Sequence, residues 1–156
     1  MISVVIATHN DERTLGQTLA ALVPAAVDAL VREVILADAG STDHTLAIAE
    51  DAGARIVRNE GAVEARLLEG CKAARADWVL ILEASVSAPH GWEGAARRHM
   101  ERHPGRAAYW GRSGLAPFVT PAKAVLVPRR LFEKESGSPG WLRRLGGKAT
   151  GLKITR

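Results

Sequence analysis

Residues 34–45 constrain the fold of this chain more than any other stretch. They read V-I-L-A-D-A-G-S-T-D-H-T, so an apolar run typical of a buried strand ends on the carboxylate of Asp38. Gly40 and Ser41 follow, and these residue types favour a tight turn and the start of a helix. In an open α/β sheet, a strand, an acid, a glycine turn and a helix build a ligand site at the carboxyl end of the strand. The stretch therefore predicts an α/β fold with a ligand site at Asp38.

The start of the chain has the same layout. Residues 2–7 are apolar, and five polar residues follow them: Thr8, His9, Asn10, Asp11 and Glu12. Because parallel strands end at the same edge of a sheet, both segments deliver polar groups to one place. A carboxylate there can accept hydrogen bonds from ribose hydroxyls or from a base N–H group. The two segments thus predict a nucleotide or nucleotide-sugar ligand.

Each of these polar residues also has a purely structural interpretation. Asp38 can instead be a turn acid that accepts hydrogen bonds from nearby backbone N–H groups. Asn10 and Asp11 can be plain helix caps, and His9 can be a solvated loop histidine. The sequence leaves both alternatives open at these positions.

Strand and helix patterns alternate four times in the first two thirds of the chain. Strands are predicted at 2–7, 34–37, 55–57 and 78–82, and helices at 13–23, after Ser41 or Thr42, at 62–76 and at 89–102. Beyond residue 104 the pattern predicts strands at 107–110 and 122–127, a Gly/Pro loop between them at 111–121, a short helix at 128–135 and a glycine-rich, loop-like segment at 136–147. This alternation favours a mostly parallel sheet with helices on both faces, and the wholly apolar strand 78–82 lies near its centre.

Length and charge suggest one domain with two unequal parts. At 156 residues the chain fits a single domain, with a nucleotide-binding half at 1–105 and a basic acceptor-side or tail region at 106–156. Residues 1–104 carry 10 Lys/Arg and 15 Asp/Glu, whereas residues 105–156 carry 11 Lys/Arg and 2 Asp/Glu. The basic part is either a solvated tail or a surface for phosphates or anionic lipid.

Cysteine usage and hydropathy indicate the compartment. The single cysteine, Cys71, excludes an internal disulfide and fits a buried, apolar role. Neither a signal peptide nor a membrane-spanning segment is visible. We therefore expect a cytoplasmic protein, with peripheral contact to the inner membrane face as an open alternative and no nucleic-acid partner.

The segment after the fourth strand is a candidate metal site. Glu83 and Ser85 stand at its end in the order L-E-A-S. Mn²⁺ and Mg²⁺ prefer oxygen ligands and are often held by one or two carboxylates plus substrate phosphates. Arg66 can reach a diphosphate at the same edge. The structural alternatives are a polar strand end for Glu83 and an ordinary surface arginine for Arg66.

Several other classes of site are disfavoured by missing motifs. The chain has no G-x-G-x-x-G, no Walker A loop and no G-x-S-x-G sequence. A receiver-like signalling domain with Asp38 as phosphoacceptor fits Asp11 and Glu12 superficially, but it fits the G-S-T-D turn poorly.

Five segments together resemble the family 2 glycosyltransferases. I-S-V-V-I-A-T-H-N-D-E at 2–12 is similar to the first strand and loop of that family, and V-I-L-A-D-A-G-S-T-D at 34–43 resembles its second-strand signature. W-V-L-I-L-E-A-S at 78–85 falls where the family has its D-x-D metal motif. P-H-G-W at 89–92 and A-V-L-V-P-R-R-L-F at 124–132 are also similar.

The resemblance implies a GT-A fold and transfer of a hexosyl group from a nucleotide-diphosphate sugar, with Mn²⁺ or Mg²⁺ as cofactor. By position, Thr8, Asn10 and Glu12 match the nucleotide-contacting first loop, and Asp38 matches the nucleoside-binding acid. Glu83 and Ser85 match the two acids of the metal motif.

Two departures separate the chain from the family pattern. The metal motif reads Glu83-Ala84-Ser85, so the second carboxylate is missing. The segment W-L-R-R-L-G at 141–146 resembles the helix that follows the family's general base, yet residues 137–140 carry no acid. Glu133 and Glu135 are then the nearest candidate bases. A catalytically degenerate domain that binds a nucleotide or a protein is therefore the alternative to an active transferase.

Overall fold

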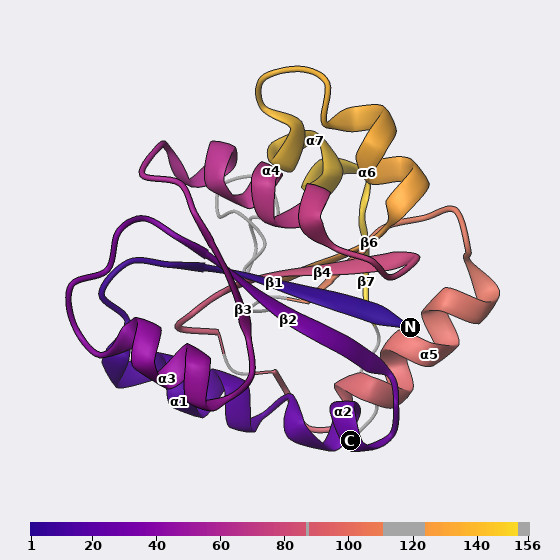
Figure 1. The fold of residues 1–156 in the computed structure, drawn as a ribbon. Coiled ribbons are helices and arrows are strands. Elements are labelled where there is room, and N and C mark those ends of the chain that lie inside the picture. Colours follow the sequence, from indigo (N-terminus) through magenta and orange to yellow (C-terminus); the bar gives the residue numbers. More distant parts are fainter. Residues whose placement is uncertain (87, 111–123, 153–156) are drawn as a thin grey trace, which may run out of the picture.

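The computed structural model describes residues 1–86, 88–110 and 124–152 of the chain, and a seven-stranded sheet forms their centre (Figure 1). The strands lie in the order β3-β2-β1-β4-β6-β5-β7. Their bounds are β1 Ile2–Thr8, β2 Val31–Asp38, β3 Arg55–Arg58, β4 Trp78–Glu83, β5 Ala108–Trp110, β6 Ala124–Pro128 and β7 Thr150–Gly151. The sheet contains every strand that the sequence predicted, plus the short β7.

The first four strands run parallel to one another. β1 pairs with β2 and with β4, and β2 pairs with β3. The strands β1 and β4 are almost entirely buried, which explains their unbroken apolar sequences. β4 lies between β1 and β6, so the predicted central strand is confirmed.

The last three strands extend the same sheet with mixed directions. β6 is antiparallel to both β4 and β5, whereas β7 is parallel to β5. Pro128 at the end of β6 lies opposite Trp78 at the start of β4. The chain therefore leaves β6 at the edge of the sheet where β4 begins.

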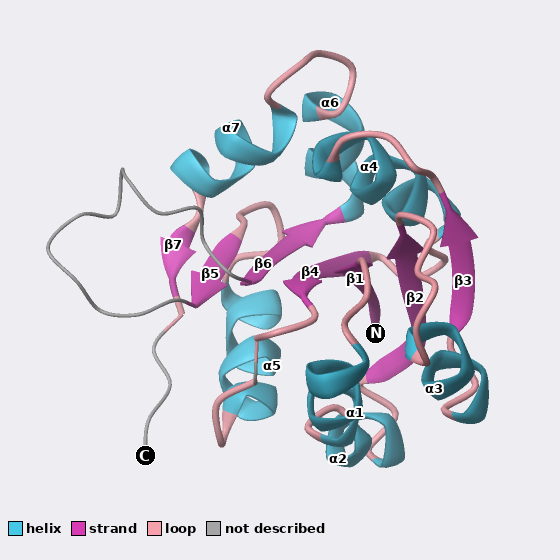
Figure 2. Ribbon diagram, turned by 90° about the vertical axis from the view of Figure 1, so that its left-hand side faces the viewer, coloured by secondary structure: helices cyan, strands magenta, loops and turns pink. Residues whose placement is uncertain are grey.

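Helices cover both faces of the sheet, which gives three layers (Figure 2). One layer holds α1 Glu12–Ala20, α2 Val23–Val27, α3 Thr45–Asp51 and α5 Trp92–Arg102; the other holds α4 Val63–Ala73, α6 Arg129–Glu135 and α7 Trp141–Lys148. Alternate residues of each strand enter the two cores that these layers make. On β1, for example, Val4 and Ile6 belong to one core and Val5 to the other. The predicted α/β architecture with helices on both faces is thus confirmed.

The helix bounds differ from the predictions in several places. The helix predicted at 13–23 ends at Ala20. A separate short helix, α2, begins at Val23 with Pro24 in its first turn, because proline fits the first turn of a helix but not its interior. The helix predicted after Ser41 or Thr42 begins only at Thr45. The glycine-rich pattern predicted a loop at 136–147, but α7 lies there, as the resemblance of 141–146 to a family helix implied. The predicted loop at 111–121 lies outside the described residues.

Candidate functional site

The carboxyl ends of the four parallel strands meet at one edge of the sheet, called here the carboxyl edge. Thr8 lies beside Asp38 in the register of β1 and β2, and Ala7 lies beside Glu83 in the register of β1 and β4. Arg58 is the register partner of Asp38 on β3. The structure therefore brings together the strand ends that the sequence predicted to form a site.

Asp38 is fully buried at this edge, and its carboxylate accepts four hydrogen bonds. Oδ2 accepts from the backbone N–H groups of Gly40 and Ser41, each at 2.8 Å. Oδ1 accepts from the hydroxyl of Thr8 at 3.0 Å and from that of Ser41 at 2.5 Å. Burial raises the pKa of Asp38, but these hydrogen bonds to the charged form outweigh it and hold the pKa below its ordinary value. This geometry is that of the turn-acid alternative: Asp38 fixes the loop that follows β2.

The loops after β1 and β2 are tied to each other by their side chains. The side chain of Asn10 accepts from the N–H of Thr42 at 2.8 Å, and the N–H of Asn10 donates to the hydroxyl of Ser41 at 2.9 Å. The N–H of Asp11 donates to the hydroxyl of Thr45 at 2.8 Å. Asn10 has a positive φ of 56°, a conformation that asparagine tolerates better than most residues. The two loops thus form one wall.

Glu12 extends this wall at the first turn of α1. Its Oε2 accepts from the backbone N–H of His44 at 3.1 Å and lies 2.9 Å from Nδ1 of the His44 ring. The hydrogen bonds from His44 lower the pKa of Glu12. In turn, the N–H of Glu12 donates to Asp43 at 3.2 Å. Asp11 is the N-cap residue of α1 but makes no capping hydrogen bond with its side chain, and the Asn10 side chain accepts from Thr42 instead.

Glu83 and Ser85 lie in the turn that follows β4, and both side chains are exposed. Between them, Ala84 is buried, and its carbonyl accepts a hydrogen bond from the hydroxyl of Thr18 on α1 at 2.6 Å. The N–H of Val86 closes the turn by donating to the carbonyl of Glu83 at 2.9 Å. Glu83 therefore offers an exposed carboxylate at the carboxyl edge.

The turn after β4 offers oxygen ligands to a divalent metal ion. Within residues 1–86, 88–110 and 124–152, no three His, Cys, Asp or Glu side chains are grouped to hold a metal ion. Glu83 and Ser85 supply one carboxylate and one hydroxyl, and Mg²⁺ is commonly held by one or two carboxylates together with substrate phosphates. This donor set fits an ion that binds together with a diphosphate.

Arg66 projects from the first half of α4, which begins at the carboxyl edge just after β3. Its Nε is buried and has no hydrogen-bond partner among the described residues. A buried guanidinium nitrogen without a partner is costly, and a bound anion would satisfy it. Arg66 is thus suited to hold a negatively charged ligand group.

The two candidate bases lie on α6 and differ in their exposure and in their contacts. Glu135 is buried, and its Oε2 lies 3.4 Å from Nε of Arg144 on α7. The Glu133 side chain is 59% exposed, with its carboxylate 4.0 Å from the guanidinium of Arg129. α6 begins at the edge opposite Glu83, because the N–H of Arg129 donates to the carbonyl of Asp77 at 2.8 Å.

Sequence reasoning missed four residues that organise the site. Thr18 supports the turn of Glu83, and Thr45 and Asp43 bind backbone N–H groups of the first loop. Glu64 on α4 accepts from the N–H groups of Gly140 and Leu142, at 3.2 and 3.1 Å. The only available signal was their residue type, since Thr and Asp often bond to nearby backbone. Their partners lie too far along the chain for a sequence pattern to show.

The chain was compared with known proteins, and the family model for glycosyl transferase family 2 matches residues 3–114. The glucosyl-3-phosphoglycerate synthase of Mycolicibacterium paratuberculosis is 36% identical over 98 residues, covering 57% of this chain and 30% of that protein. The synthase of Mycobacterium tuberculosis is 34% identical over the same length and with the same coverage. The chain thus spans about a third of the length of these relatives.

Solved structures show the same fold. The M. tuberculosis glucosyl-3-phosphoglycerate synthase in complex with Mn²⁺ and uridine-diphosphate-glucose has a TM-score of 0.77 at 22% identity, covering 99% of this chain and 69% of that one. Staphylococcus aureus TarS 1–349 has a TM-score of 0.74 at 17% identity, covering 94% of this chain and 54% of that one.

These structures are GT-A glycosyltransferases, so the predicted GT-A fold is confirmed. The family match covers well over half of the chain, including both loops of the carboxyl edge, Arg66 and Glu83. The chain belongs to glycosyl transferase family 2.

Proposed function

We propose that the chain binds a nucleotide-diphosphate sugar at the carboxyl edge and transfers its hexosyl group to an acceptor. The observation that carries the proposal is the convergence of three features at one edge of the sheet. These are the two interlocked loops, the exposed carboxylate of Glu83 and the buried Nε of Arg66, which has no hydrogen-bond partner in the part of the chain that the structure describes. Together they offer polar contacts for a nucleoside, a metal ligand and a cation for a diphosphate.

UDP-glucose is the proposed donor. The relatives that support it are glucosyl-3-phosphoglycerate synthases, one of which has been solved with Mn²⁺ and UDP-glucose. Thr8 and Asp38 would hold the nucleoside wall in shape, while Asn10 and Glu12 line it from the first loop. The Asp38 carboxylate is buried, and its oxygens already accept hydrogen bonds from the protein. We therefore propose that Asp38 positions this wall.

The diphosphate would be held by Arg66 and by Mn²⁺ or Mg²⁺ at Glu83 and Ser85. A bound metal ion of this kind stabilises the negative charge that develops on the leaving diphosphate. Glu83 supplies the carboxylate, and the hydroxyl of Ser85 supplies a second, weaker oxygen. The guanidinium of Arg66 adds a fixed positive charge beside the same group.

The acceptor hydroxyl needs a base in an inverting transfer, and Glu133 and Glu135 are the candidates. Glu135 is buried and engaged with Arg144, whereas Glu133 is exposed and only 4.0 Å from Arg129, so we propose Glu133 as the base. A general base typically contributes about 10²–10⁴-fold to the rate. Glu133→Gln should then lower the rate of hexosyl transfer within this range and leave donor binding unchanged.

Calorimetric titration of UDP, GDP and their hexose conjugates, with and without Mn²⁺, tests the donor site. We expect UDP and UDP-glucose to bind more tightly than their GDP counterparts, with an affinity that rises when Mn²⁺ is added. Glu83→Ala should abolish the gain from Mn²⁺. Absence of binding to every nucleotide would overturn the proposal.

A second function, nucleotide binding without transfer, is favoured by one observation. The loop before α7 carries no acid, and the buried candidate Glu135 is committed to the ion pair with Arg144. In that case UDP-glucose binds, but no hexose reaches water or an added acceptor. If the parent chain turns over UDP-glucose and Glu83→Ala does not, the chain is an active transferase.

We also propose that the basic region 106–156 contacts an anionic membrane surface. Arg130, Lys134 and Arg143 are exposed, whereas Arg129 and Arg144 bond to other parts of the fold. None of the helices among the described residues has the length and apolar character that a membrane span requires. Binding to vesicles that contain phosphatidylserine, weakened by salt, is expected; equal retention on neutral vesicles would contradict it.

A further inference from the structure

Thr18 on α1 makes a buried contact with the segment that carries Glu83. Only 3% of Thr18 is exposed, and its hydroxyl lies 2.6 Å from the carbonyl oxygen of Ala84. The same hydroxyl lies 3.3 Å from the carbonyl of Thr14, one turn earlier in the helix. Since a hydroxyl has one hydrogen to donate, the shorter contact to Ala84 is the stronger one.

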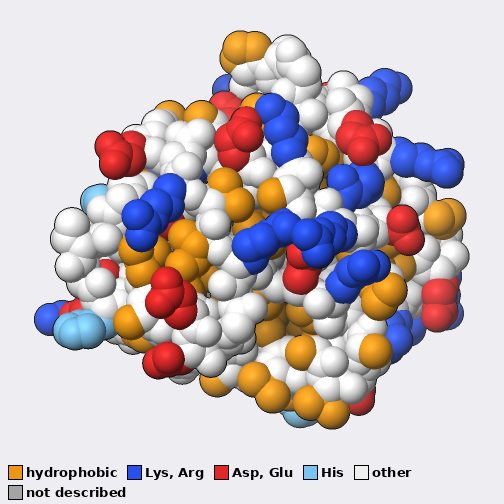
Figure 3. All heavy atoms as spheres, in the orientation of Figure 1, with side chains coloured by type: hydrophobic (Ala, Val, Ile, Leu, Met, Phe, Trp, Pro, Cys, Tyr) orange, Lys and Arg blue, Asp and Glu red, His pale blue; other side chains and the backbone are white. Residues whose placement is uncertain are grey.

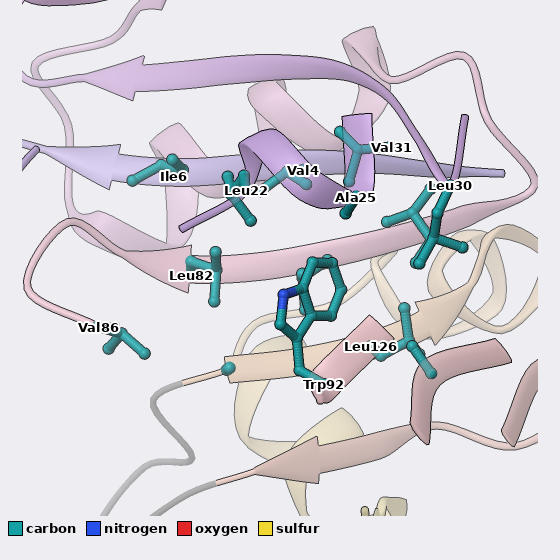
Figure 4. Close-up of a cluster of buried hydrophobic side chains, with 14 of the residues drawn as sticks. Val4, Ile6, Leu22, Ala25, Leu30, Val31, Leu82, Val86, Trp92 and Leu126 are labelled. Atoms are coloured by element: carbon teal, nitrogen blue, oxygen red, sulfur yellow. The ribbon is translucent and has the colours of Figure 1, made fainter. Parts of the chain in front are cut away.

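The turn after β4 is anchored on one side and free on the other. Ala84 and Val86 are buried in the core cluster with Leu15 and Trp92, whereas Glu83 and Ser85 are exposed. Figure 4 shows Val86, which follows this turn, in the same cluster as Leu82 and Trp92. The apolar side chains fix the inward side of the turn, and the Thr18 hydroxyl fixes its backbone.

We propose that Thr18 is a positioning residue for the metal and diphosphate site, because it holds the Ala84 carbonyl and thereby aims Glu83 and Ser85 at the carboxyl edge. The inference rests on the proposed function, since it assigns Thr18 to the donor site described above. The site has only one carboxylate, so the orientation of Glu83 decides how well it binds the ion. Outer residues that orient metal ligands commonly matter about 10–100-fold for metal affinity.

Helix α1 also connects the wall formed by the two loops to the segment that carries Glu83 and Ser85. α1 begins at Glu12, whose N–H bonds to Asp43 in the loop after β2. Two turns later the same helix bonds to the segment after β4 through Thr18. One short helix thus fixes the nucleoside wall at its start and the metal ligands near its end.

Thr18→Val removes the hydroxyl at nearly the same size, and Thr18→Ser keeps it. Thr14→Val is the matched control, because it makes the same change one turn earlier without touching Ala84. UDP affinity is measured by calorimetry without metal and with saturating Mn²⁺, and the ratio of the two gives the gain from metal. We expect Thr18→Val to lower this gain about tenfold or more while metal-free affinity stays within about twofold of the parent chain.

The two control variants decide whether the effect is specific. Thr18→Ser and Thr14→Val should both keep the parent gain from Mn²⁺. An unchanged gain in Thr18→Val would overturn the inference. So would an equal loss of UDP affinity with and without Mn²⁺, because this is the signature of a merely structural residue.

Amide hydrogen exchange separates this inference from the proposed function. Without any nucleotide, Thr18→Val should speed exchange of the Val86 amide about tenfold, and Thr18→Ser should not. The amides of β1 and β2 should exchange as in the parent chain. If the parent chain binds no UDP, the proposed function fails by itself; unchanged exchange at Val86 would instead refute the role of Thr18.

Discussion

At the scale of single residues, Asp38 shows how a predicted ligand contact can serve the fold first. Its carboxylate has no exposed surface, and hydrogen bonds from two hydroxyls and two backbone N–H groups surround it. The sequence correctly placed an acid at the end of the second strand, next to the first loop. It could not separate a nucleoside ligand from a turn acid, because both need the same residue at the same place.

The lowered pKa of Asp38 predicts a pH-dependent contribution to stability. A group whose pKa is lower in the folded state stabilises the fold above its unfolded pKa of about 3.9 and loses this effect as pH falls. Asp38→Asn should therefore lower the free energy of unfolding by about 1–3 kcal/mol at pH 7, and by less near pH 3. Urea unfolding of both chains at the two pH values measures the difference.

The exposed Asp51 at the end of α3 offers the control for this experiment. Asp51→Asn should change the free energy of unfolding by no more than about 0.5 kcal/mol at either pH. A difference between the parent chain and Asp38→Asn that is equal at pH 7 and pH 3 would contradict the role given to the charged carboxylate.

Arg66 allows the diphosphate to be tested apart from the nucleoside. Its buried Nε has no partner within residues 1–86, 88–110 and 124–152, so a phosphate oxygen would gain a charge-assisted hydrogen bond there. Arg66→Met should weaken UDP binding about tenfold or more and leave uridine binding unchanged. Calorimetry with UDP and uridine measures both effects.

Arg75 is the matched control, because it also carries one positive charge but lies near the start of β4, at the opposite edge. Arg75→Met should leave both affinities at their parent values. If Arg66→Met weakens UDP and uridine equally, the arginine shapes the nucleoside wall and does not hold the diphosphate.

At the scale of elements, α7 depends on side chains from other parts of the chain. Glu64 on α4 accepts hydrogen bonds from Gly140 and Leu142 at its start, and Arg144 binds the carbonyls of Glu135, Ser138 and Pro139. The first N–H groups of a helix lack partners within it, and Glu64 supplies one from a distant segment. The start of α7 is thereby fixed to the helix that carries Arg66.

Glu64→Ala tests this attachment. The change removes two hydrogen bonds to the first turn of α7, so the free energy of unfolding should fall by about 1–2 kcal/mol. Amide exchange at Leu142 should become faster than in the parent chain. Chemical unfolding and amide exchange give the two quantities.

Glu69 lies on the same helix and pairs with Lys72 at the surface, at 3.0 Å. Glu69→Ala should cost no more than about 0.5 kcal/mol, because exposed ion pairs contribute little. Equal effects of the two substitutions would mean that α7 is held by its apolar contacts alone.

The elements that sequence reasoning missed are those that depend on distant partners. β1, β2 and β4 carry their own signal, since each is apolar over most of its length. Gly146 and Gly147 weaken the helix signal in the sequence of α7. Glu64, which binds the start of α7, lies 76 residues before Gly140. The contact between Thr18 and Ala84 spans 66 residues and likewise leaves no local pattern.

At the scale of the whole molecule, both parts of the chain contribute to the same sheet and the same cores. β6 from the basic region pairs with β4 from the nucleotide-binding half. Leu126 and Trp110 belong to one core with Ile6 and Leu80, and Trp141 belongs to the other with Val5. Lys and Arg side chains are interspersed with acids over the face formed by β3 and α4, so positive charge is not confined to the basic region (Figure 3).

This sharing predicts that the two parts unfold together. Leu126 is fully buried on β6 and lies between Leu80 and Ala108 in the sheet. Leu126→Ala should lower the free energy of unfolding by about 2–5 kcal/mol through lost burial and the cavity it leaves. Urea unfolding should stay a single transition, with amide exchange rising on β1 and β2 as much as on β5 and β6.

The exposed Val63 on α4 provides the control, since Val63→Ala removes apolar atoms that are already 46% exposed and should cost little. Faster exchange confined to β5 and β6 in Leu126→Ala would show that residues 106–152 unfold as a separate unit. Because Leu126 touches strands from both parts, a uniform response would instead mean that the sheet supporting Glu83 is stable only while β6 is in place. The basic region would then be a structural requirement of the donor site.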